Sequence, residues 1–187
     1  AFEAGVEIAA AYPGTPSTEI LENISKYKEI YSEWSVNEKV AFEVAYGAAV
    51  GGKRALAAMK HVGVNVASDA LMTGAYTGTN AGFVFISADD PGMHSSQNEQ
   101  DNRYYAKFAK IPMLEPSTPQ EAKDFVRIGL ELSEQFDTPV LMRMTTRICH
   151  GKGLVEMQER ETKETLKYKK DPGKFVMIPA HARGRHV

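Results

Sequence analysis

Cysteine is almost absent from this sequence, because only one of its 187 residues, Cys149, is a cysteine. A single thiol excludes an internal disulfide framework and a complete cysteine-ligated metal or iron–sulfur site within the chain. Long hydrophobic runs are missing as well. No apolar stretch approaches the roughly 18 residues of a membrane-spanning helix, and no signal peptide is recognisable. These absences predict a cytoplasmic protein that does not enter a membrane.

An excess of positive charge is also missing. Lysine and arginine together number 22 against 24 acidic residues, which gives a net charge of −2. This balance lacks the basic surface of a nucleic-acid-binding domain, so we expect no nucleic-acid partner. Hydrophobic residues make up 43% of the sequence. This proportion is enough for one domain with a sizeable core.

Short apolar segments alternate with helix-like segments along the chain. We predict strands at 6–12, 30–36, 54–60, 82–88, 111–116 and 139–148. Helices are predicted at 15–27, 37–50, 65–78 and 119–136. This alternation is typical of a three-layer α/β fold, with a largely parallel sheet of about six strands and helices on both faces. Right-handed crossovers then gather the strand-to-helix loops at one edge of the sheet, where we expect the function.

The two ends of the chain differ from this pattern. Residues 1–5, AFEAG, read as the last turn of a helix that ends at Gly5. From about Glu156 the chain is polar and poorly periodic. We therefore predict a domain over residues 1–150, followed by a polar extension or linker over residues 151–187. The chain is expected to be a piece of a longer protein.

The loop after the first predicted strand reads YPGTPSTE, residues 12–19. Pro13-Gly14 predicts a tight turn, Thr15 can cap the following helix, and Pro16 suits the first helical position. The exposed amides at such a helix start could hold an anion. An ordinary strand–turn–helix junction explains the same residues, and both interpretations stay open at this point.

A carboxyl side chain, Glu38, stands where an apolar run passes into an alanine-rich helix. Ser35-x-x-Glu38 fits a capping box, in which the serine and the glutamate satisfy backbone amides at the helix start. A carboxyl at a strand-to-helix junction also lies where parallel α/β sheets bind their ligands. The residues alone leave a capping role and a chemical role open.

The predicted strand at 54–60 ends in Lys60 and is followed by His61, so both are expected at the ligand-binding edge. A histidine in that position could relay protons near neutral pH, or it could be a solvated loop residue.

The longest polar stretch is DDPGMHSSQNEQDNR, residues 89–103. Polar loops of this length inside a compact domain are usually functional or mobile. Its acidic and histidine side chains suggest an oxygen-rich metal site, and the residues concerned are Asp89, Asp90, His94, Glu99 and Asp101. Because their spacing matches no metal-binding motif, we predict no metal ligand in this chain.

Residues 47–53 read G-x-x-x-x-G-K, which is close to a phosphate-binding P-loop. Arg54 stands where that motif needs a magnesium-binding serine or threonine, and the segment ends a helix instead of following a strand. A helix that terminates at Gly51-Gly52 explains the residues better, so nucleotide hydrolysis is excluded.

Six segments, taken in order, resemble one protein family. They are YPGTPSTEI, EWSVNEKVAFEVAYGAA, AAMKHVGVNVASDALM, ADDPGMHSSQNEQDNR, AKIPMLEPSTPQEAK and DTPVLMRMTTR. The sequence is similar to the alpha subunit of indolepyruvate ferredoxin oxidoreductase, in its N-terminal domain that binds the pyrimidine of thiamine diphosphate. The similarity covers about residues 1–150 and continues more weakly through FVMIPAHARGRH.

The resemblance implies a thiamine diphosphate-binding fold and an oxidoreductase activity. The implied reaction is the oxidative decarboxylation of an aryl 2-oxo acid such as indolepyruvate, with coenzyme A as acyl acceptor and ferredoxin as electron acceptor. Pyruvate enzymes of the wider family carry a Ser-Gly-Pro-Gly-type stretch where this chain has Lys60-His61-Val62-Gly63. That departure favours a bulkier aryl substrate over pyruvate, and a related enzyme of other substrate range is the alternative.

The resemblance also implies roles for individual residues. Glu38 takes the position of the glutamate that hydrogen-bonds N1′ of the aminopyrimidine and activates it, a role that is compatible with capping. His61 is placed with it as a second catalytic residue. The residues implied on the cofactor side are Pro13, Gly14, Thr15, Glu38, Gly63 and Asn65, and those on the substrate side are His94, Ser95, Gln97, Asn98, Gln100 and Asp101.

Several implied parts have no counterpart in these residues. The diphosphate and its Mg²⁺ should bind a second thiamine domain of the same subunit, and 4Fe-4S clusters should lie elsewhere in the full-length subunit. A beta subunit is the implied partner, and a homodimer could form through an apolar face. The chain alone is expected to be inactive. Two other functions stay open, a non-catalytic assembly domain with a vestigial site and a phosphate-binding regulatory module at Thr15.

Overall fold

The computed structural model describes residues 1–186 and shows a six-stranded sheet in the order β2-β1-β3-β4-β6-β5. Every neighbouring pair of strands is parallel. The strands are β1 (Ile8–Ala11), β2 (Tyr31–Trp34), β3 (Ala55–Lys60), β4 (Phe83–Asp89), β5 (Met113–Leu114) and β6 (Val140–Thr145). Each lies within or at one residue of a predicted apolar segment, so the predicted parallel sheet is confirmed.

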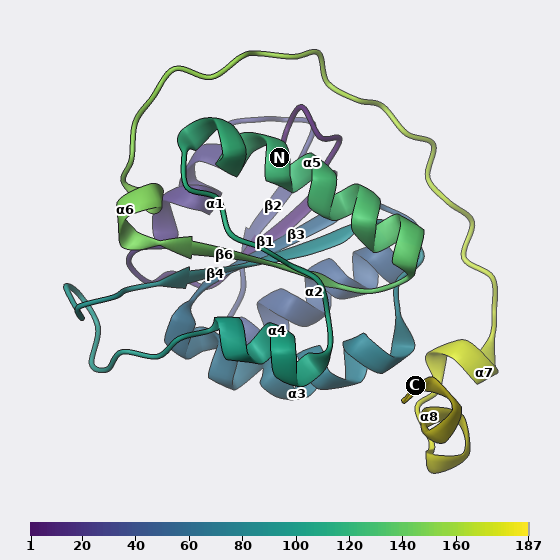
Figure 1. Ribbon diagram of the computed structural model, residues 1–187. Helices are drawn as coiled ribbons and strands as arrows, with labels where there is room; N and C mark the ends of the chain where they lie inside the picture. The colour runs from purple at the N-terminus through teal and green to yellow at the C-terminus, as the bar shows by residue number, and fades with distance from the viewer. Residues whose placement is uncertain (187) are drawn as a thin grey trace.

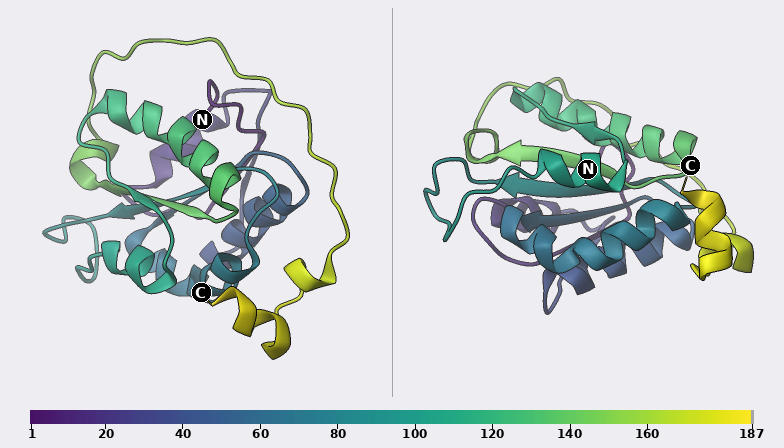
Figure 2. Two further views of the ribbon diagram at one scale, coloured as in Figure 1. Left: turned by 45° about the vertical axis from the view of Figure 1, so that its right-hand side comes forward. Right: turned by 60° about the horizontal axis from the view of Figure 1, so that its bottom comes forward.

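Helices cover both faces of this sheet (Figure 1). One face carries α1 (Thr18–Ile24) and α5 (Pro119–Phe136), and the other carries α2 (Glu38–Val50), α3 (His61–Thr77) and α4 (Arg103–Ala109). Three short helices follow, α6 (Thr146–Cys149), α7 (Pro172–Phe175) and α8 (Pro179–Arg185). The right-hand view of Figure 2 shows the sheet between its two helical layers, which confirms the predicted three-layer architecture. Within residues 1–186, no helix combines the length and apolarity needed to cross a membrane.

The sheet divides the apolar core into two parts. On the α2–α3 side, the ring of Phe42 packs edge-on against Phe83 and Phe85 of β4, with ring centroids 5.0 and 5.4 Å away. On the opposite side, Leu21 of α1 and Leu130 of α5 are fully buried against the strands. Strands covered on both faces need apolar residues at nearly every position, which explains the continuous apolar runs of the sequence. This double burial makes the sheet a rigid support for the loops at its edge.

Helix α3 begins four residues earlier than predicted. The predicted start was Asn65, whereas α3 begins at His61, directly after the last residue of β3, Lys60. The side chain of Lys60 makes no capping hydrogen bond, so the sequence carries no local signal for this helix start. Residues 61–64 therefore form the first helical turn and not a loop.

Helix α1, in contrast, begins later than predicted. Its first residue is Thr18 and its N-cap is Ser17, so Thr15 and Pro16 precede the helix. The hydroxyl of Thr18 accepts a hydrogen bond from the amide of Gly14 at 2.9 Å. The prediction that Thr15 caps the helix and Pro16 opens it is therefore wrong, and α1 offers no uncapped helix start at Thr15 for an anion.

Glycines follow the first turn of the chain and helix α2, at the two places where the sequence predicted that a segment ends. Residues 2–5 form a single turn, closed by a bond from the Gly5 amide to the Phe2 carbonyl, and Gly5 has a left-handed φ of +72°. Helix α2 ends at Val50 ahead of Gly52, whose φ is +102°. The segment that resembles a P-loop is thus a helix end, as predicted.

Residues 151–171 have no helix or strand and pass around the outside of the domain toward α7 (Figure 1). They are nevertheless bound to it. The amide of Glu161 donates to the carbonyl of Glu3 at 2.9 Å. The buried guanidinium of Arg54 pairs with Glu161 at 2.6 Å and with Glu134 of α5 at 2.7 Å. The extension is therefore joined to the chain start and, through Arg54, to α5.

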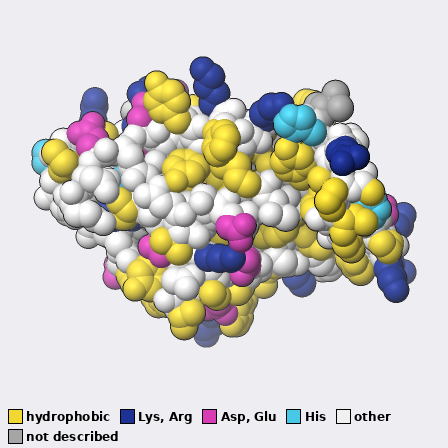
Figure 3. All heavy atoms as spheres, turned by 90° about the horizontal axis from the view of Figure 1, so that it is seen from below, with side chains coloured by type: hydrophobic (Ala, Val, Ile, Leu, Met, Phe, Trp, Pro, Cys, Tyr) yellow, Lys and Arg dark blue, Asp and Glu magenta, His cyan; other side chains and the backbone are white. Residues whose placement is uncertain are grey.

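Large apolar side chains are exposed on the side of α3 and α4. Figure 3 shows hydrophobic side chains gathered on this face among basic and acidic ones. The most exposed rings belong to α4, where Phe108 is 76% and Tyr104 is 68% exposed, and Val66 of α3 is 48% exposed. Exposed apolar side chains gathered on neighbouring helices are typical of a surface that another protein segment covers.

Candidate functional site

The predicted site residues follow strands that end at the same edge of the sheet. Pro13 follows β1, Glu38 follows β2 and His61 follows β3, and all three strands run parallel. The chain passes from β1 outward to β2 and then back to β3, so the strand order reverses between β1 and β3. Parallel sheets bind ligands in the crevice outside such a reversal. The predicted common edge for these three residues is confirmed.

Glu38 is the first residue of α2 but does not cap it. Asn37 is the N-cap, and its side-chain oxygen accepts from the amide of Val40 at 2.9 Å. The hydroxyl of Ser35 donates to the carboxylate of Glu33 at 3.0 Å. The capping-box interpretation of Ser35 and Glu38 is therefore wrong, because a neighbouring asparagine performs the capping. This leaves the half-buried Glu38 carboxyl available for another role.

The side chain of Glu38 lies against the first turn of α3 at Gly63. A Cβ atom built on Gly63 would stand 2.5 Å from Glu38 Cγ and 2.7 Å from Glu38 Oε1, closer than real carbon atoms approach. Gly63 is fully buried and helical, so its lack of a side chain is required by packing and not by backbone conformation. The carboxyl of Glu38 thus packs on the backbone of α3, between the starts of two helices.

This arrangement fits the aminopyrimidine of thiamine diphosphate. A ring nitrogen such as N1′ needs one carboxyl at a fixed position, and Glu38 provides it at the edge where the sheet collects ligands. The space over Gly63 is filled by the Glu38 side chain, so the carboxyl packs directly on the backbone of α3.

The loop after β1 also lies at this edge of the sheet, beside the end of β3. Gly14 lies against Lys60 at the end of β3, because a Cβ on Gly14 would stand 3.2 Å from Lys60 Cβ. The ammonium of Lys60 donates to the carbonyl of Ser95 at 2.7 Å, and the hydroxyl of Ser95 lies 3.4 Å from the carbonyl of Thr15. Two residues predicted on the cofactor side, Gly14 and Thr15, are therefore close to Ser95 of the predicted substrate-side loop.

His61 is completely buried, which rules out a solvated loop histidine. Its Nε2 lies 3.1 Å from the carbonyl of Asn98, so the imidazole holds the main chain of the 90–102 loop. Its Nδ1 is buried and has no hydrogen-bond partner within residues 1–186. The histidine lies under the loop, and its contact with Asn98 is to the backbone.

Side-chain amides join the same loop to α3. The amides of Asn65 and Gln100 bond reciprocally at 3.0 and 2.9 Å. The carbonyl of His61 accepts from Gln100 and from Asn102, each at 3.0 Å. These bonds bring together Asn65, Gln100 and His61, all of which the sequence assigned to the site. Asn102 was not predicted, and it is the buried centre of this group.

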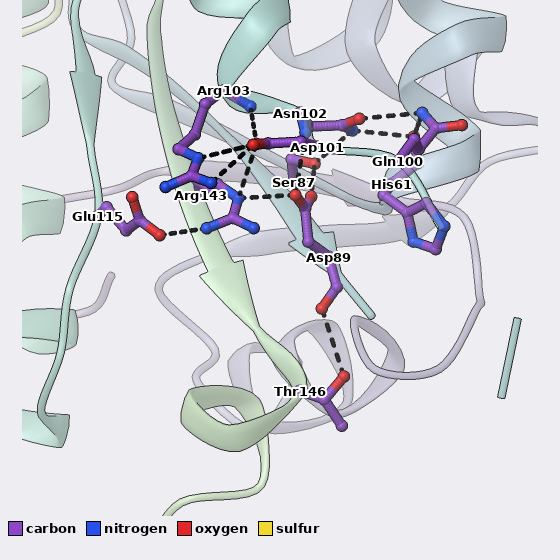
Figure 4. Close-up of polar contacts among 10 residues, drawn as sticks. All are labelled: His61, Ser87, Asp89, Gln100, Asp101, Asn102, Arg103, Glu115, Arg143 and Thr146. Carbon is purple, nitrogen blue, oxygen red and sulfur yellow. Dashed lines mark hydrogen bonds and ion pairs between the residues drawn. The ribbon is translucent and has the colours of Figure 1, made fainter. Parts of the chain in front are cut away.

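A buried ion pair at the ends of β4 and β6 supports Asn102 (Figure 4). The guanidinium of Arg143 donates to the carboxylate of Asp89 at 2.7 Å and also pairs with Glu115. Asp89 accepts in addition from the Ser87 hydroxyl at 2.8 Å and from the Asn102 amide at 3.0 Å. Buried charges are retained only when paired, so this network fixes where the 90–102 loop returns to the domain. A charged residue inside the apolar run VLMRMT was the available signal for it.

The next residue, Asp90, holds the other end of the loop. Its carboxylate accepts from the Ser96 hydroxyl at 2.6 Å, the Ser95 amide at 2.8 Å and the Thr146 hydroxyl at 2.9 Å. Burial alone would raise the pKa of Asp90, but these hydrogen bonds outweigh it and hold the pKa well below its usual range. Asp90 thus stays ionised and joins the loop to α6.

The remaining loop residues do not converge with Glu38. His94 packs over Gly92, where a Cβ would lie 3.2 Å from its Nε2, and His94 and Gln97 are both exposed. Asp101 pairs with Arg103 at 2.7 Å. Within residues 1–186, no three His, Cys, Asp or Glu side chains gather in a way that could hold a metal ion. The acidic residues 89 and 90 are instead engaged in the hydrogen bonds described above.

Comparison with known proteins gives the site a family context. The family described as "Pyruvate flavodoxin/ferredoxin oxidoreductase, thiamine diP-bdg" matches residues 1–184. Indolepyruvate oxidoreductase subunit IorA of Methanothermobacter marburgensis is 55% identical over 188 residues, covering 98% of this chain and 30% of that protein. Subunit IorA of Archaeoglobus fulgidus is 52% identical over 192 residues, covering 98% of this chain and 31% of that protein. The chain therefore spans about a third of the length of these relatives.

Solved structures share the fold at low sequence identity. A 2-oxoglutarate:ferredoxin oxidoreductase from Magnetococcus marinus superposes with a TM-score of 0.68 at 19% identity, covering 76% of this chain and 27% of that one. A benzoylformate decarboxylase from Polynucleobacter necessarius gives a TM-score of 0.65 at 16% identity, covering 87% of this chain and 31% of that one. With the family match over residues 1–184 and the identities above 50%, the chain belongs to the thiamine diphosphate-binding family of the pyruvate flavodoxin/ferredoxin oxidoreductases.

Proposed function

We propose that this chain supplies the aminopyrimidine side of a thiamine diphosphate site in a 2-oxoacid:ferredoxin oxidoreductase that acts on aryl 2-oxo acids such as indolepyruvate. The observation that carries the proposal is the placement of Glu38. The Glu38 side chain lies at the edge of the sheet where the strands have their C-terminal ends, and it packs on the backbone of Gly63. It does not cap α2, because Asn37 does so.

Thiamine diphosphate, when bound, supplies the carbon nucleophile for decarboxylation of a 2-oxo acid. The part of Glu38 is to hold a proton between its carboxyl and N1′ of the aminopyrimidine. Gly63 keeps the carboxyl within reach of that nitrogen, because any side chain there would displace it. General acid–base contacts of this kind depend on hydrogen-bond reach first and on acidity second.

The other assigned residues act around this carboxyl. Pro13, Gly14 and Thr15 form the neighbouring wall, since Gly14 packs on Lys60. We propose that His61 is a positioning residue, because its buried imidazole holds the Asn98 main chain and thereby the substrate-side loop. In this proposal His61 contributes to catalysis indirectly, because it holds in position the loop residues that lie at the surface.

The substrate and acceptors are proposed from relatives. The two proteins that are 52% and 55% identical are named indolepyruvate oxidoreductase subunits, which supports an aryl 2-oxo acid. The structural neighbour from Magnetococcus marinus contains 2-oxoglutarate, coenzyme A and succinyl-CoA, which supports coenzyme A as acyl acceptor. Ferredoxin is the proposed electron acceptor because that neighbour is named for it.

The complete enzyme needs parts beyond these residues. We propose that a second thiamine domain holds the diphosphate with Mg²⁺, and that 4Fe-4S clusters elsewhere in the full-length subunit carry the electrons. Cys149 alone cannot ligate a cluster. A beta subunit and a cytoplasmic location complete the proposal. The exposed rings of Tyr104 and Phe108 are the proposed contact with a partner domain or, in the isolated chain, with a second copy.

The proposal is tested by Glu38→Gln in the complete enzyme, assembled with its partner subunit. An amide cannot share a proton with N1′ as a carboxyl does, so turnover of indolepyruvate should fall about 10²–10⁴-fold while thiamine diphosphate remains bound. The matched control is Glu43→Gln, one turn along α2, whose side chain is half exposed and pairs only with Lys39 at 3.9 Å. Near-normal decarboxylation in Glu38→Gln with full cofactor loading would refute the proposal and favour a non-catalytic assembly role.

A further inference from the structure

A second reversal of strand order lies at the opposite half of the carboxyl edge. The chain leaves β4 through α4 to the edge strand β5 and returns through α5 to β6, which pairs with β4. Helix α4, which follows β4, covers one face of the sheet, whereas Ile148 and Cys149 of α6, which follows β6, pack on the other face. The loops that follow β4 and β6 therefore diverge, and a crevice outside such a divergence is a general ligand-binding position in parallel sheets.

An open cavity of about 520 Å³ lies at this second reversal. That volume is within the range of small-molecule sites, about 300–1,000 Å³. It is lined from the β4 side by Pro91 and His94, and from the β6 side by Thr145, Thr146, Arg147 and His150. Of the residues predicted for the Glu38 site, only His94 of the substrate-side loop lines this cavity, and Glu38 itself lies beyond β3.

The polar lining of this cavity consists of hydrogen-bond donors. Arg147 offers a guanidinium, and no carboxylate within residues 1–186 lies within ion-pair distance of it. His94 and His150 add two imidazoles and Thr145 adds a hydroxyl, whereas the hydroxyl of Thr146 already donates to Asp90. The nearest acidic groups are both engaged. Asp90 is satisfied by Ser95, Ser96 and Thr146, and Glu19 lies 3.2 Å from Nδ1 of His150.

The walls of the cavity are fixed relative to each other. Asp90 bonds the β4 loop on one side through the Ser95 amide and the start of α6 on the other through the Thr146 hydroxyl. The hydroxyl of Thr146 also lies 3.3 Å from the carbonyl of Asp89. His94 and Arg147 are therefore presented on segments that the same carboxylate holds together.

From this geometry we infer that the cavity is an oxyanion-binding site for a small molecule that carries a phosphate or a carboxylate. Arg147 is its main ligand residue, since a guanidinium binds both groups through two parallel hydrogen bonds. His94 from the β4 side and His150 from the β6 side are the two further residues that we expect to contact the same anion. The inference uses no residue of the proposed cofactor site and does not depend on that proposal.

The test is titration of the ¹⁵N-labelled 187-residue chain at low salt with two probes, sodium pyrophosphate and phenylpyruvate. Binding should shift the amide signals of His94 and of residues 145–150 in a saturable way. Arg147→Ala should weaken the affinity about tenfold or more, as expected for the loss of a charge-assisted bidentate contact. The matched control is Arg183→Ala, which removes the same charge from exposed α8.

The two probes distinguish the source of the anion. Tighter binding of pyrophosphate assigns the site to a phosphate-bearing ligand, and tighter binding of phenylpyruvate assigns it to the carboxylate of a 2-oxo acid. The inference is overturned if neither probe gives saturable shifts by about 10 mM, or if Arg147→Ala binds as tightly as Arg183→Ala. Glu38→Gln should leave the titration unchanged, so a failure of the proposed cofactor role would be seen separately.

Discussion

Replacing Gly63 by alanine should separate folding from catalysis. The added Cβ would stand 2.5 Å from Glu38 Cγ, whereas non-bonded carbon atoms approach to about 3.5 Å. The Glu38 side chain must therefore move by about 1 Å, which it can do because it is half exposed at the start of its helix. A displacement of that size in a catalytic group costs up to about 10²-fold in rate.

The fold should survive the same change. Gly63 lies in the first turn of α3 with an ordinary helical backbone, where alanine is intrinsically favoured by up to about 1 kcal/mol. That gain offsets the cost of moving Glu38. We therefore expect an unfolding temperature within about 4 °C of the parent chain by circular dichroism, together with a large loss of indolepyruvate turnover in the complete enzyme.

Gly47→Ala is the matched control, because a Cβ on this α2 glycine meets no atom within 4 Å. It should raise the unfolding temperature by about 2–4 °C and leave turnover unchanged. Full activity in Gly63→Ala would refute the reasoning, since it would mean that the position of the Glu38 carboxyl does not matter. A chain that fails to fold would show that Glu38 cannot move aside.

Three further results are expected. Asp89→Asn should lower the free energy of unfolding in urea by about 3–5 kcal/mol, because Arg143 would keep its buried charge without that partner; a loss under 1 kcal/mol would contradict this. Burial raises the pKa of Cys149 to about 12, so iodoacetamide at pH 8 should alkylate it at least about a hundred times more slowly than a free thiol, and equal rates would contradict the burial. Burial alone would raise the pKa of Glu134, but the ion pair with Arg54 and further charge contacts lower it to about 2. A lowered folded-state pKa contributes stability above the unfolded value near about 4.3 and loses it toward pH 2. Thermal melts of Glu134→Gln should therefore lose less stability than the parent between those values, and parallel curves would contradict the assignment.

Local signals in the sequence predicted some elements to the residue. Helix α5 was predicted over 119–136 and has those limits. The Thr118 side chain caps this helix and Pro119 is its first residue. The carboxylate of Glu121 accepts a hydrogen bond from the amide of Ser117 at 2.7 Å. Each of these signals acts over a few residues, so it can be read without tertiary structure.

Other features depend on contacts that the sequence does not display. Helix α3 starts at His61 without a capping side chain, so no local residue marks this start. The residues that bond the His61 carbonyl, Gln100 and Asn102, lie in a loop about 40 residues away. Glu38 was correctly placed at the ligand edge, but the predicted capping box of Ser35 and Glu38 was wrong, because Asn37 is the N-cap. The pairing of Arg143 with Asp89 cannot be seen locally, because Arg143 reads as a charge in an apolar strand and Asp89 as the first residue of a polar loop.

The extension that passes around the domain has a consequence for how the molecule opens. Arg160 donates to the carbonyls of Phe2 and Val6, and Glu161 bonds the carbonyl of Glu3, so the chain start is held by residues about 155 positions away. Both segments are also held to the domain by Arg54, which pairs with Glu161 and donates to the carbonyl of Ala4. If one segment detaches, the other loses part of its contacts, and the two should behave as a single cooperative unit. Their amides should then exchange hydrogen at matched rates, faster than the sheet and well before global unfolding.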